Sequence, residues 1–260
     1  MKNLLKNILP PILAKLIQKK PKYGFFGNYK TWQEAQADSI GYDSSVILEK
    51  VKNSLLKVKN GEVAYERDSV LFGKVEYSWP VLAGLLWTAS QKENTLKVLD
   101  FGGSLGSSYF QNLNFFKHLK NIRWNIVEQN NFVKCGKEFF EDDNLKFYPS
   151  IEDCLFANEI DVLLASSSIQ YLEDPYSFLH KIIDSNFEYI IIDRTPFLKN
   201  EDRITIQKVN PKIYNAVYPA WLLNENKFIK IIEGRYERIA DWESYFGTIK
   251  LKGFILKKIK

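Results

Sequence analysis

Leu96-Lys-Val-Leu-Asp-Phe-Gly-Gly-Ser-Leu-Gly-Ser-Ser-Tyr109 is the stretch that decides the fold of this 260-residue chain. Its first residues, up to Phe101, form a short apolar run of the kind that a parallel sheet buries on both faces. Glycines and serines then interrupt the run, and a serine can cap the helix that we expect over about 109–119. A strand, a glycine loop and a helix in this order predict the start of a nucleotide-binding βαβ unit.

The spacing of the glycines excludes two common phosphate-binding motifs. No lysine follows Gly106, so the loop is not a P-loop. The dinucleotide fingerprint needs glycine at its third and sixth positions, which are Ser104 and Ser107 when counted from Gly102. The strand ends at an acidic residue, Asp100, which can hold the loop amides or bind a cation. The glycine loop after it is suited to a ligand without a pyrophosphate.

The composition favours a globular protein with few options for metal or nucleic-acid chemistry. Apolar residues make up 45% of the chain and aromatic residues 15%, and the net charge is a mild +5. The lysines are scattered rather than gathered into a dense stripe, so we expect no nucleic-acid partner. Cys135 and Cys154 have no metal-binding spacing and predict free thiols in a reducing cytoplasm. His118 and His180 are too few for a histidine-rich site, and we predict no bound metal.

The chain divides into three parts. Residues 1–20 are a basic amphipathic segment, with apolar residues at helical spacing and lysines opposite. The segment is too short and too lysine-rich to span a bilayer. It can lie peripherally on an anionic membrane, or dock on its own domain or on a partner, and both readings stay open. Residues 21–95 predict a mainly helical N-terminal cap, and residues 96–260 the nucleotide-binding domain.

Further apolar runs continue the βαβ pattern after the glycine loop. They predict a mostly parallel, doubly wound α/β sheet that ends in an antiparallel pair. An insertion rich in proline, asparagine and aromatic residues, including Tyr214, Tyr218 and Trp221, precedes that pair and can line a pocket. The predicted parallel strands are 124–128, 145–148, 161–165 and 189–193, the insertion is 198–227, and the closing strands are 228–238 and 250–259.

Polar residues follow several of these strands at their carboxyl ends, where α/β sheets bind ligands. Glu128 lies about twenty residues after the glycine loop, at the position where such folds bind ribose hydroxyls, and Gln129 can add a polar contact. Ser150 and Ile151 follow the next strand, where an adenine edge would lie. The pair 193–194, Asp-Arg, is either an acceptor-binding pair or a structural ion pair.

The glycine-loop stretch resembles motif I of class I S-adenosylmethionine-dependent methyltransferases, which reads apolar-Asp/Glu-x-Gly-x-Gly-x-Gly. Gly102 and Gly106 match its first and third glycines, whereas Ser104 stands at the second. With four further stretches, the chain is similar to a bacterial methyltransferase family associated with surface-polysaccharide genes. Those stretches are Phe26-Gly-Asn-Tyr29, Tyr65-Glu-Arg-Asp-Ser69, Tyr77-Ser-Trp-Pro80 and Ile192-Asp-Arg-Thr-Pro-Phe197.

The resemblance implies a Rossmann-like methyltransferase fold, the cofactor S-adenosylmethionine and roles for particular residues. It places Asp193 as a base or acceptor anchor, Arg194 as a clamp for an anionic group, and Tyr171 beside the reacting methyl group. Glu66 and Arg67 would belong to a charged lid, although a solvated helix face explains them equally simply. The implied cofactor-binding residues are Asp100, Gly102, Gly103, Ser104, Gly106, Glu128, Gln129, Ser150, Ile151 and Ser166.

Three functions therefore compete at the level of sequence. The favoured one is a cytoplasmic methyltransferase that modifies an oxygen or nitrogen of a sugar or other small polar acceptor in surface-glycan biosynthesis. A nucleotide-sugar oxidoreductase or epimerase is disfavoured by the missing dinucleotide fingerprint. A non-catalytic scaffold that binds the cofactor and recruits glycan-modifying partners remains open. Acceptor identity and oligomeric state are not encoded in any motif of the chain.

Overall fold

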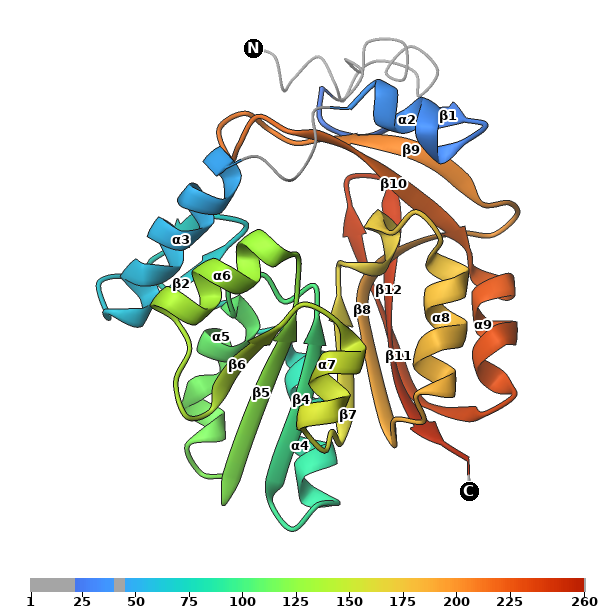
Figure 1. Ribbon diagram of the computed structural model, residues 1–260. Coiled ribbons are helices and arrows are strands. Elements are labelled where there is room, and N and C mark those ends of the chain that lie inside the picture. Colours follow the sequence, from blue (N-terminus) through green and yellow to red (C-terminus); the bar gives the residue numbers. More distant parts are fainter. Residues whose placement is uncertain (1–21, 40–44, 260) are drawn as a thin grey trace, which may run out of the picture.

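The computed structural model describes residues 22–39 and 45–259, which form a central sheet with helices on both faces (Figure 1). The amphipathic segment predicted over residues 1–20 lies outside the described residues. Among the helices that the structure describes, none combines the length and the apolar character needed to cross a bilayer.

Five parallel strands make the centre of the sheet, and they confirm the predicted βαβ pattern. The glycine-loop strand β4 (Thr95–Phe101) lies in the middle, between β5 (Asn121–Val127) and β7 (Val162–Ser166). Beyond these neighbours lie β6 (Leu145–Tyr148) and β8 (Tyr189–Leu198). Every pair in this series is parallel, so all five carboxyl ends meet at one edge of the sheet.

Two late strands complete the methyltransferase arrangement. β12 (Ile249–Lys258) runs antiparallel to β8, and β11 (Tyr236–Phe246) runs antiparallel to β12. The last strand in sequence is thus inserted beside the last parallel strand, with its predecessor outside it. Together with the order of the five parallel strands, this is the Rossmann-like sheet of class I methyltransferases, as the sequence predicted.

The prediction of the first closing strand, over residues 228–238, was wrong. Residues 228–238 were expected to be extended, but α9 (Glu225–Glu233) occupies most of that range. The side chain of Asn224 accepts a hydrogen bond from the Lys227 amide at 2.7 Å and caps the helix. Phe228 and Ile232 are then buried one helical turn apart, so helical spacing prevails over extended structure here.

Helices cover the two faces of the sheet and enclose two separate apolar cores. Successive side chains of a strand point to opposite faces, so Val98 joins one core and Leu99 the other. The first core is closed by α3 (Ser45–Lys59), α4 (Trp79–Ser90), α5 (Ser107–Phe116) and α6 (Asn130–Phe139). The second is closed by α7 (Ile151–Ala157), α8 (Pro175–Asp184) and α9.

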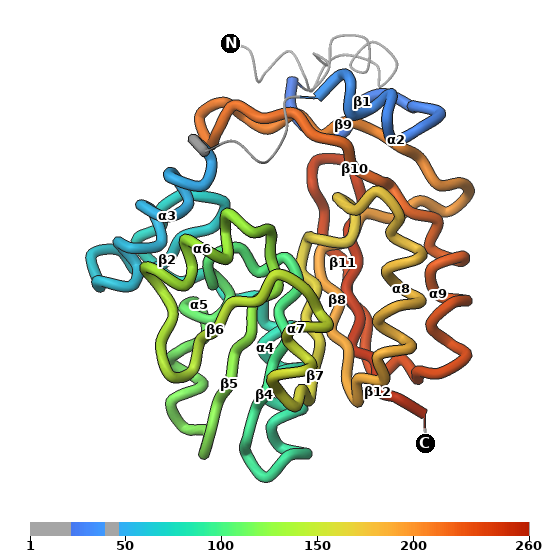
Figure 2. Tube along the Cα trace, in the orientation of Figure 1, coloured from blue at the N-terminus to red at the C-terminus, as the bar shows by residue number. Residues whose placement is uncertain are grey.

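The predicted insertion extends the main sheet. β9 (Arg203–Lys208) and β10 (Val217–Asn224) are antiparallel, and the end of β10 pairs with the end of β8. β1 (Gly24–Tyr29) then adds to the free side of β9, so the N-terminal cap contributes a strand to this sheet. Figure 2 shows these blue and orange segments running together although the sequence separates them widely.

The remainder of the cap consists of helices and a short hairpin. α2 (Trp32–Ala37) packs on β9 and β10. The hairpin joins β2 (Tyr65–Arg67) to β3 (Val70–Phe72) through Asp68 and Ser69. Both turn residues have positive φ, 52° and 67°, which defines a type I′ turn without glycine.

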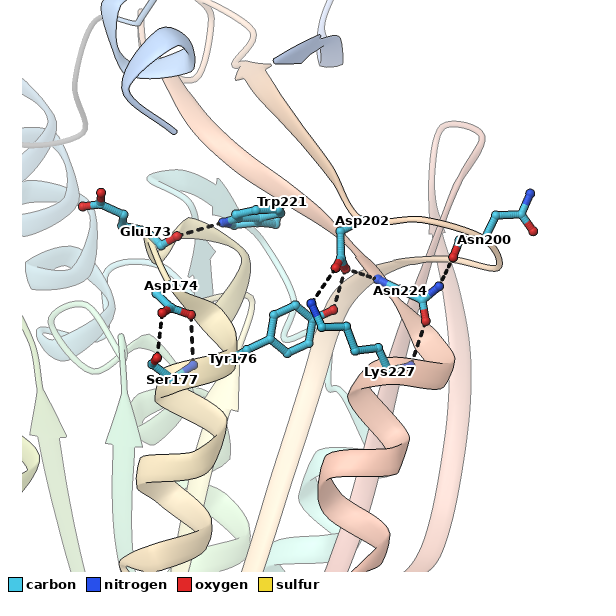
Figure 3. A network of polar contacts seen from close by, with 9 residues as sticks. All are labelled: Glu173, Asp174, Tyr176, Ser177, Asn200, Asp202, Trp221, Asn224 and Lys227. Carbon is cyan, nitrogen blue, oxygen red and sulfur yellow. Dashed lines mark hydrogen bonds and ion pairs between the residues drawn. The ribbon is translucent and has the colours of Figure 1, made fainter. Parts of the chain in front are cut away.

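A polar network fastens the insertion to α8 and α9 (Figure 3). Asp202 accepts hydrogen bonds from the Tyr176 hydroxyl, from the Asn224 amide at 2.6 Å and from Lys227 Nζ at 3.0 Å. Burial alone would raise the pKa of Asp202, but these hydrogen bonds outweigh it and lower that pKa. Nearby, Trp221 Nε1 donates to the carbonyl of Leu172 at 3.1 Å. The insertion is therefore held to the rest of the sheet at both of its ends.

Candidate active site

A large cavity opens at the carboxyl ends of β4, β5, β7 and β8. Its volume is about 1250 Å³, and the cap hairpin and the insertion form its other walls. Single-ligand sites usually span about 300–1,000 Å³, so this cavity has room for two small molecules side by side. Twelve residues predicted from the sequence line it: Glu66, Arg67, Asp100, Gly102, Gly103, Ser104, Glu128, Gln129, Ser166, Tyr171, Asp193 and Arg194.

Three of the predicted cofactor residues are absent from the described lining of this cavity. Gly106 stands at the start of α5 with φ +108°, where it shapes the backbone. The Ser150 hydroxyl accepts a hydrogen bond from the Asp153 amide at 3.0 Å and caps α7. Ile151 is buried in the second core. Pro149, next to them, is the residue of this segment that lines the cavity.

The glycine loop is shaped by close approach rather than by flexibility. A Cβ atom on Gly102 would lie 2.6 Å from Ser168 Cβ, and one on Gly103 would lie 2.5 Å from the Asp100 carboxyl. Ser104 stands where motif I has its second glycine, and it adopts φ +55°. The serine thus takes the left-handed conformation that glycine adopts at no steric cost.

Glu128 faces this loop from the end of β5. Its carboxylate accepts hydrogen bonds from the Ser104 amide at 3.2 Å and from the Gln129 amide at 2.9 Å. Burial raises the pKa of Glu128, and the two amide hydrogen bonds act in the opposite direction. A carboxylate has about four lone-pair sites, so capacity remains for ribose hydroxyls.

Asp100 lies beneath the loop and is almost completely buried. Trp124 Nε1 donates a hydrogen bond to its carboxylate at 3.0 Å. Burial raises the pKa of Asp100 to about 7, with a smaller contribution from the charge of Glu128. Asp100 therefore supports the loop from inside the sheet and can change its protonation near neutral pH.

Asp193 is the most heavily engaged carboxylate on the far side of the cavity. It accepts hydrogen bonds from the Ser166 hydroxyl at 2.8 Å and from Trp242 Nε1 at 3.1 Å. Arg194 Nε lies 3.5 Å from the same carboxylate. Sequence reasoning missed Trp242, because it belongs to β11, which the misplaced closing strand put elsewhere.

Glu66 and Arg67, the predicted lid residues, point to different partners. Glu66 is buried and accepts hydrogen bonds from the Ser69 amide at 3.0 Å and from the Ser107 hydroxyl. Burial raises the pKa of Glu66, against the effect of those two donors. Its contacts join the hairpin to the first turn of α5. Arg67 forms an ion pair with Glu76 at 3.3 Å at the cavity wall.

An aromatic wall, which includes Tyr171, Tyr214 and Tyr218, lines part of the cavity. The Tyr171 hydroxyl donates to Gln207 Oε1 at 2.7 Å, and its ring meets Tyr218 edge-on at 5.1 Å. Tyr214 and Tyr218 line the cavity, as the aromatic content of the insertion suggested. Trp221 instead stacks on Trp32, with ring centres 6.2 Å apart. The lining also includes Asp68, which the sequence marked only as part of the lid segment.

Comparisons with known proteins give structural similarities without a family match. No family model and no curated protein matches the sequence. The N-terminal domain of EvdMO1, crystallised with S-adenosylhomocysteine and D-fucose, is 11% identical with a TM-score of 0.49, covering 82% of this chain and 97% of that one. TrmK of M. capricolum with S-adenosylhomocysteine is 11% identical with a TM-score of 0.39, covering 68% of each chain.

A third solved structure, the mitomycin 7-O-methyltransferase MmcR, is 14% identical with a TM-score of 0.42, covering 69% of this chain and 54% of that one. All three TM-scores are below 0.5, so the fold assignment rests on the strand order and directions described above. By those criteria the chain has the Rossmann-like fold of class I methyltransferases.

Proposed function

We propose that this protein is an S-adenosylmethionine-dependent methyltransferase. The observation that carries the proposal is the Glu128 carboxylate, held against the Ser104 amide where the glycine loop enters a large cavity. A carboxylate at the end of the second parallel strand is the group that binds ribose hydroxyls in Rossmann-like sites. The glycine loop carries no lysine or arginine for a phosphate, which suits a cofactor without one.

The chain's own residues would hold the reactants and keep water away. When bound, S-adenosylmethionine supplies an electrophilic methyl group on a positively charged sulfur. Asp100 and Gly103 shape the loop beside it, and Glu128 would hold the ribose. Methyl transfer depends mainly on placing the acceptor in line and excluding solvent. The hairpin and the aromatic wall enclose the remaining part of the cavity, where the acceptor would bind.

We further propose that the acceptor is a small polar molecule, such as a sugar, that is methylated on oxygen or nitrogen. Support comes from the wall itself, where tyrosine rings alternate with carboxylates and serines. Such surfaces suit a ring that carries several polar groups. A role in surface-glycan biosynthesis, a cytoplasmic location and a membrane contact through residues 1–20 remain predictions from the sequence.

Calorimetry with S-adenosylhomocysteine tests the cofactor assignment. We expect the wild-type protein to bind it, and Glu128→Ala to weaken binding by roughly 1–3 kcal/mol, because a charged acceptor is removed from paired hydroxyls. Glu138→Ala is the matched control, since Glu138 is an exposed glutamate on α6 outside the cavity lining. Its affinity should equal that of the wild type.

Three outcomes would count against the proposal or a part of it. Binding of NAD in place of S-adenosylhomocysteine would favour the oxidoreductase alternative. Unchanged affinity in Glu128→Ala would remove the role of Glu128. Cofactor binding without methyl transfer to any sugar nucleotide or glycan precursor would instead favour a scaffold that retains the cofactor site.

A further inference from the structure

The cavity is acidic although the protein as a whole is basic. The net charge of the chain is +5, yet carboxylates clearly outnumber basic side chains in the described lining. Arg67 and Arg194 are the only basic residues among the described residues of that lining. The net charge of the cavity lining is therefore negative, whereas that of the whole chain is positive. A negative lining favours cationic over anionic ligands.

Both guanidinium groups are already engaged by carboxylates of the same wall. Arg67 Nη2 lies 3.3 Å from Glu76, and Arg194 Nε lies 3.5 Å from Asp193. Glu243, another lining carboxylate, pairs with Lys250 at 2.6 Å outside the cavity. An anionic group would thus find no uncompensated positive charge in the described wall beyond the cofactor loop. This arrangement argues against the anion clamp that the resemblance implied for Arg194.

Asp68 differs from the other carboxylates of the lining, which all take part in ion pairs or hydrogen bonds. It stands at the tip of the hairpin with φ +52° and lines the cavity. Within the described part of the chain, no hydrogen bond or ion pair reaches its carboxylate. Tyrosines face it: burial raises the pKa of Tyr171 and of Tyr214, and the charge of Asp68 raises both further. A carboxylate among tyrosine rings is thus presented to the cavity.

Two buried hydroxyls of the same cavity lining, one of them next to Asp68 in sequence, also lack partners. Ser69, the other turn residue, is 7% exposed, and Ser168 is 9% exposed. Both line the cavity, and neither Oγ has a hydrogen-bond partner among the described residues. Buried hydroxyls are normally satisfied, so unpartnered ones at a cavity wall indicate a polar ligand. The Ser69 hydroxyl, which neighbours Asp68 in the turn, can accept a hydrogen bond from one of the N–H groups of an ammonium that pairs with the carboxylate.

We propose that this end of the cavity, formed by Asp68, Ser69, Tyr171 and Tyr214, binds a protonated amine carried by the methyl acceptor. The inference rests on the proposed function and narrows its acceptor to amine-bearing small molecules. The carboxylate supplies the counter-charge, and the faces of the tyrosine rings attract a cation through their quadrupoles. The amine in this subsite is a recognition group, and the methylated atom lies nearer the cofactor loop.

A charge series on one sugar ring tests the inference with the full-length protein saturated with S-adenosylhomocysteine. The probes are D-glucosamine, D-glucose and D-glucuronate, which are cationic, neutral and anionic at a pH below the pKa of the amine. Binding is followed by titration in nuclear magnetic resonance. We expect glucosamine to bind about ten-fold more tightly than glucose, and glucuronate to bind most weakly.

Asp68→Asn should abolish the preference for glucosamine and leave the affinity for glucose unchanged. Asparagine tolerates positive φ as well as aspartate does, so the turn should persist. Glu62→Gln is the matched control, because Glu62 is an exposed carboxylate of the same cap outside the described lining. That variant should keep the wild-type order of the three probes.

The possible failures can be told apart. Glucuronate binding as tightly as glucosamine, a retained preference in Asp68→Asn, or no glucosamine binding to the S-adenosylhomocysteine complex would overturn the amine subsite. Absence of S-adenosylhomocysteine binding would contradict the proposed function itself. Calorimetry with S-adenosylhomocysteine on Asp68→Asn separates the two cases, since its affinity should match that of the wild type.

Discussion

At the scale of single residues, Asp193, the predicted base, already interacts with several side chains of the protein itself. Its buried carboxylate accepts hydrogen bonds from the Ser166 hydroxyl and the Trp242 indole, and it forms an ion pair with the Arg194 guanidinium. Such a group positions the loop after β7 and the end of β8 relative to one another. For Asp193 to take a proton from the methyl acceptor, at least one of these side chains would have to move away from its carboxylate.

Asp193→Asn tests this residue. We expect a loss of roughly 1–3 kcal/mol in the free energy of unfolding, because the amide donates where the carboxylate accepted and leaves Arg194 without its counter-charge. Affinity for S-adenosylhomocysteine should stay close to that of the wild type, whereas turnover should fall far more. Urea denaturation measures the stability, calorimetry the affinity, and a methyl-transfer assay the turnover.

Asp184→Asn is the control for that substitution. Asp184 forms an exposed ion pair with Arg235 at 3.0 Å, and such pairs contribute about 0–1 kcal/mol. Equal stability losses in the two variants would contradict a special role for the Asp193 cluster. Intact turnover in Asp193→Asn would show that the pair is structural only, and would direct attention to Tyr171.

At the scale of elements, the polar network of Figure 3 fixes the insertion to the sheet, and Asp202 is its centre. Asp202→Ala should cost roughly 1–3 kcal/mol of unfolding free energy, because two partly buried donors, the Tyr176 hydroxyl and the Asn224 amide, lose their acceptor. Glu201→Ala is the neighbouring control, since Glu201 is exposed. Thermal unfolding compares the two, and equal melting temperatures would mean that the network does not hold the insertion.

The same scale shows where sequence reasoning succeeds and where it stops. The strands β4, β5 and β7 can be recognised in the sequence as apolar runs, and their carboxyl ends predicted Asp100, Glu128 and Ser166 as lining residues. The sequence did not predict β9 and β10, because the insertion is rich in proline and asparagine and the strand β1 that pairs with β9 lies far away in sequence. Tertiary pairing decided that these residues form strands.

At the scale of the whole molecule, burial of Asp100 makes global stability depend on pH. Its pKa is raised from 3.8 to about 7 in the folded state. Above pH 7 the fold must hold a buried charge, and below about 4 the carboxyl is protonated in both states. The contribution of Asp100 to stability is therefore most favourable at low pH and is lost as pH rises through 7.

Asp100→Asn should remove this dependence. The free energy of unfolding of the variant relative to the wild type should increase as pH rises from about 4 to 7 and then level off. Chemical denaturation at a series of pH values on both sides of 7 measures the difference. A constant difference across the series would mean that Asp100 stays ionised in the folded protein throughout.

The pairing of β1 with β9 has a consequence for how the protein is made. Gly24 in β1 pairs with Lys208 in β9. β1 is therefore synthesised early, but it can pair only after most of the chain has been synthesised. Contacts between residues so distant in sequence form late, because the intervening loop must be closed first. The βαβ units around the glycine loop can assemble before then. The nascent protein would thus complete its cofactor half first and its acceptor wall last.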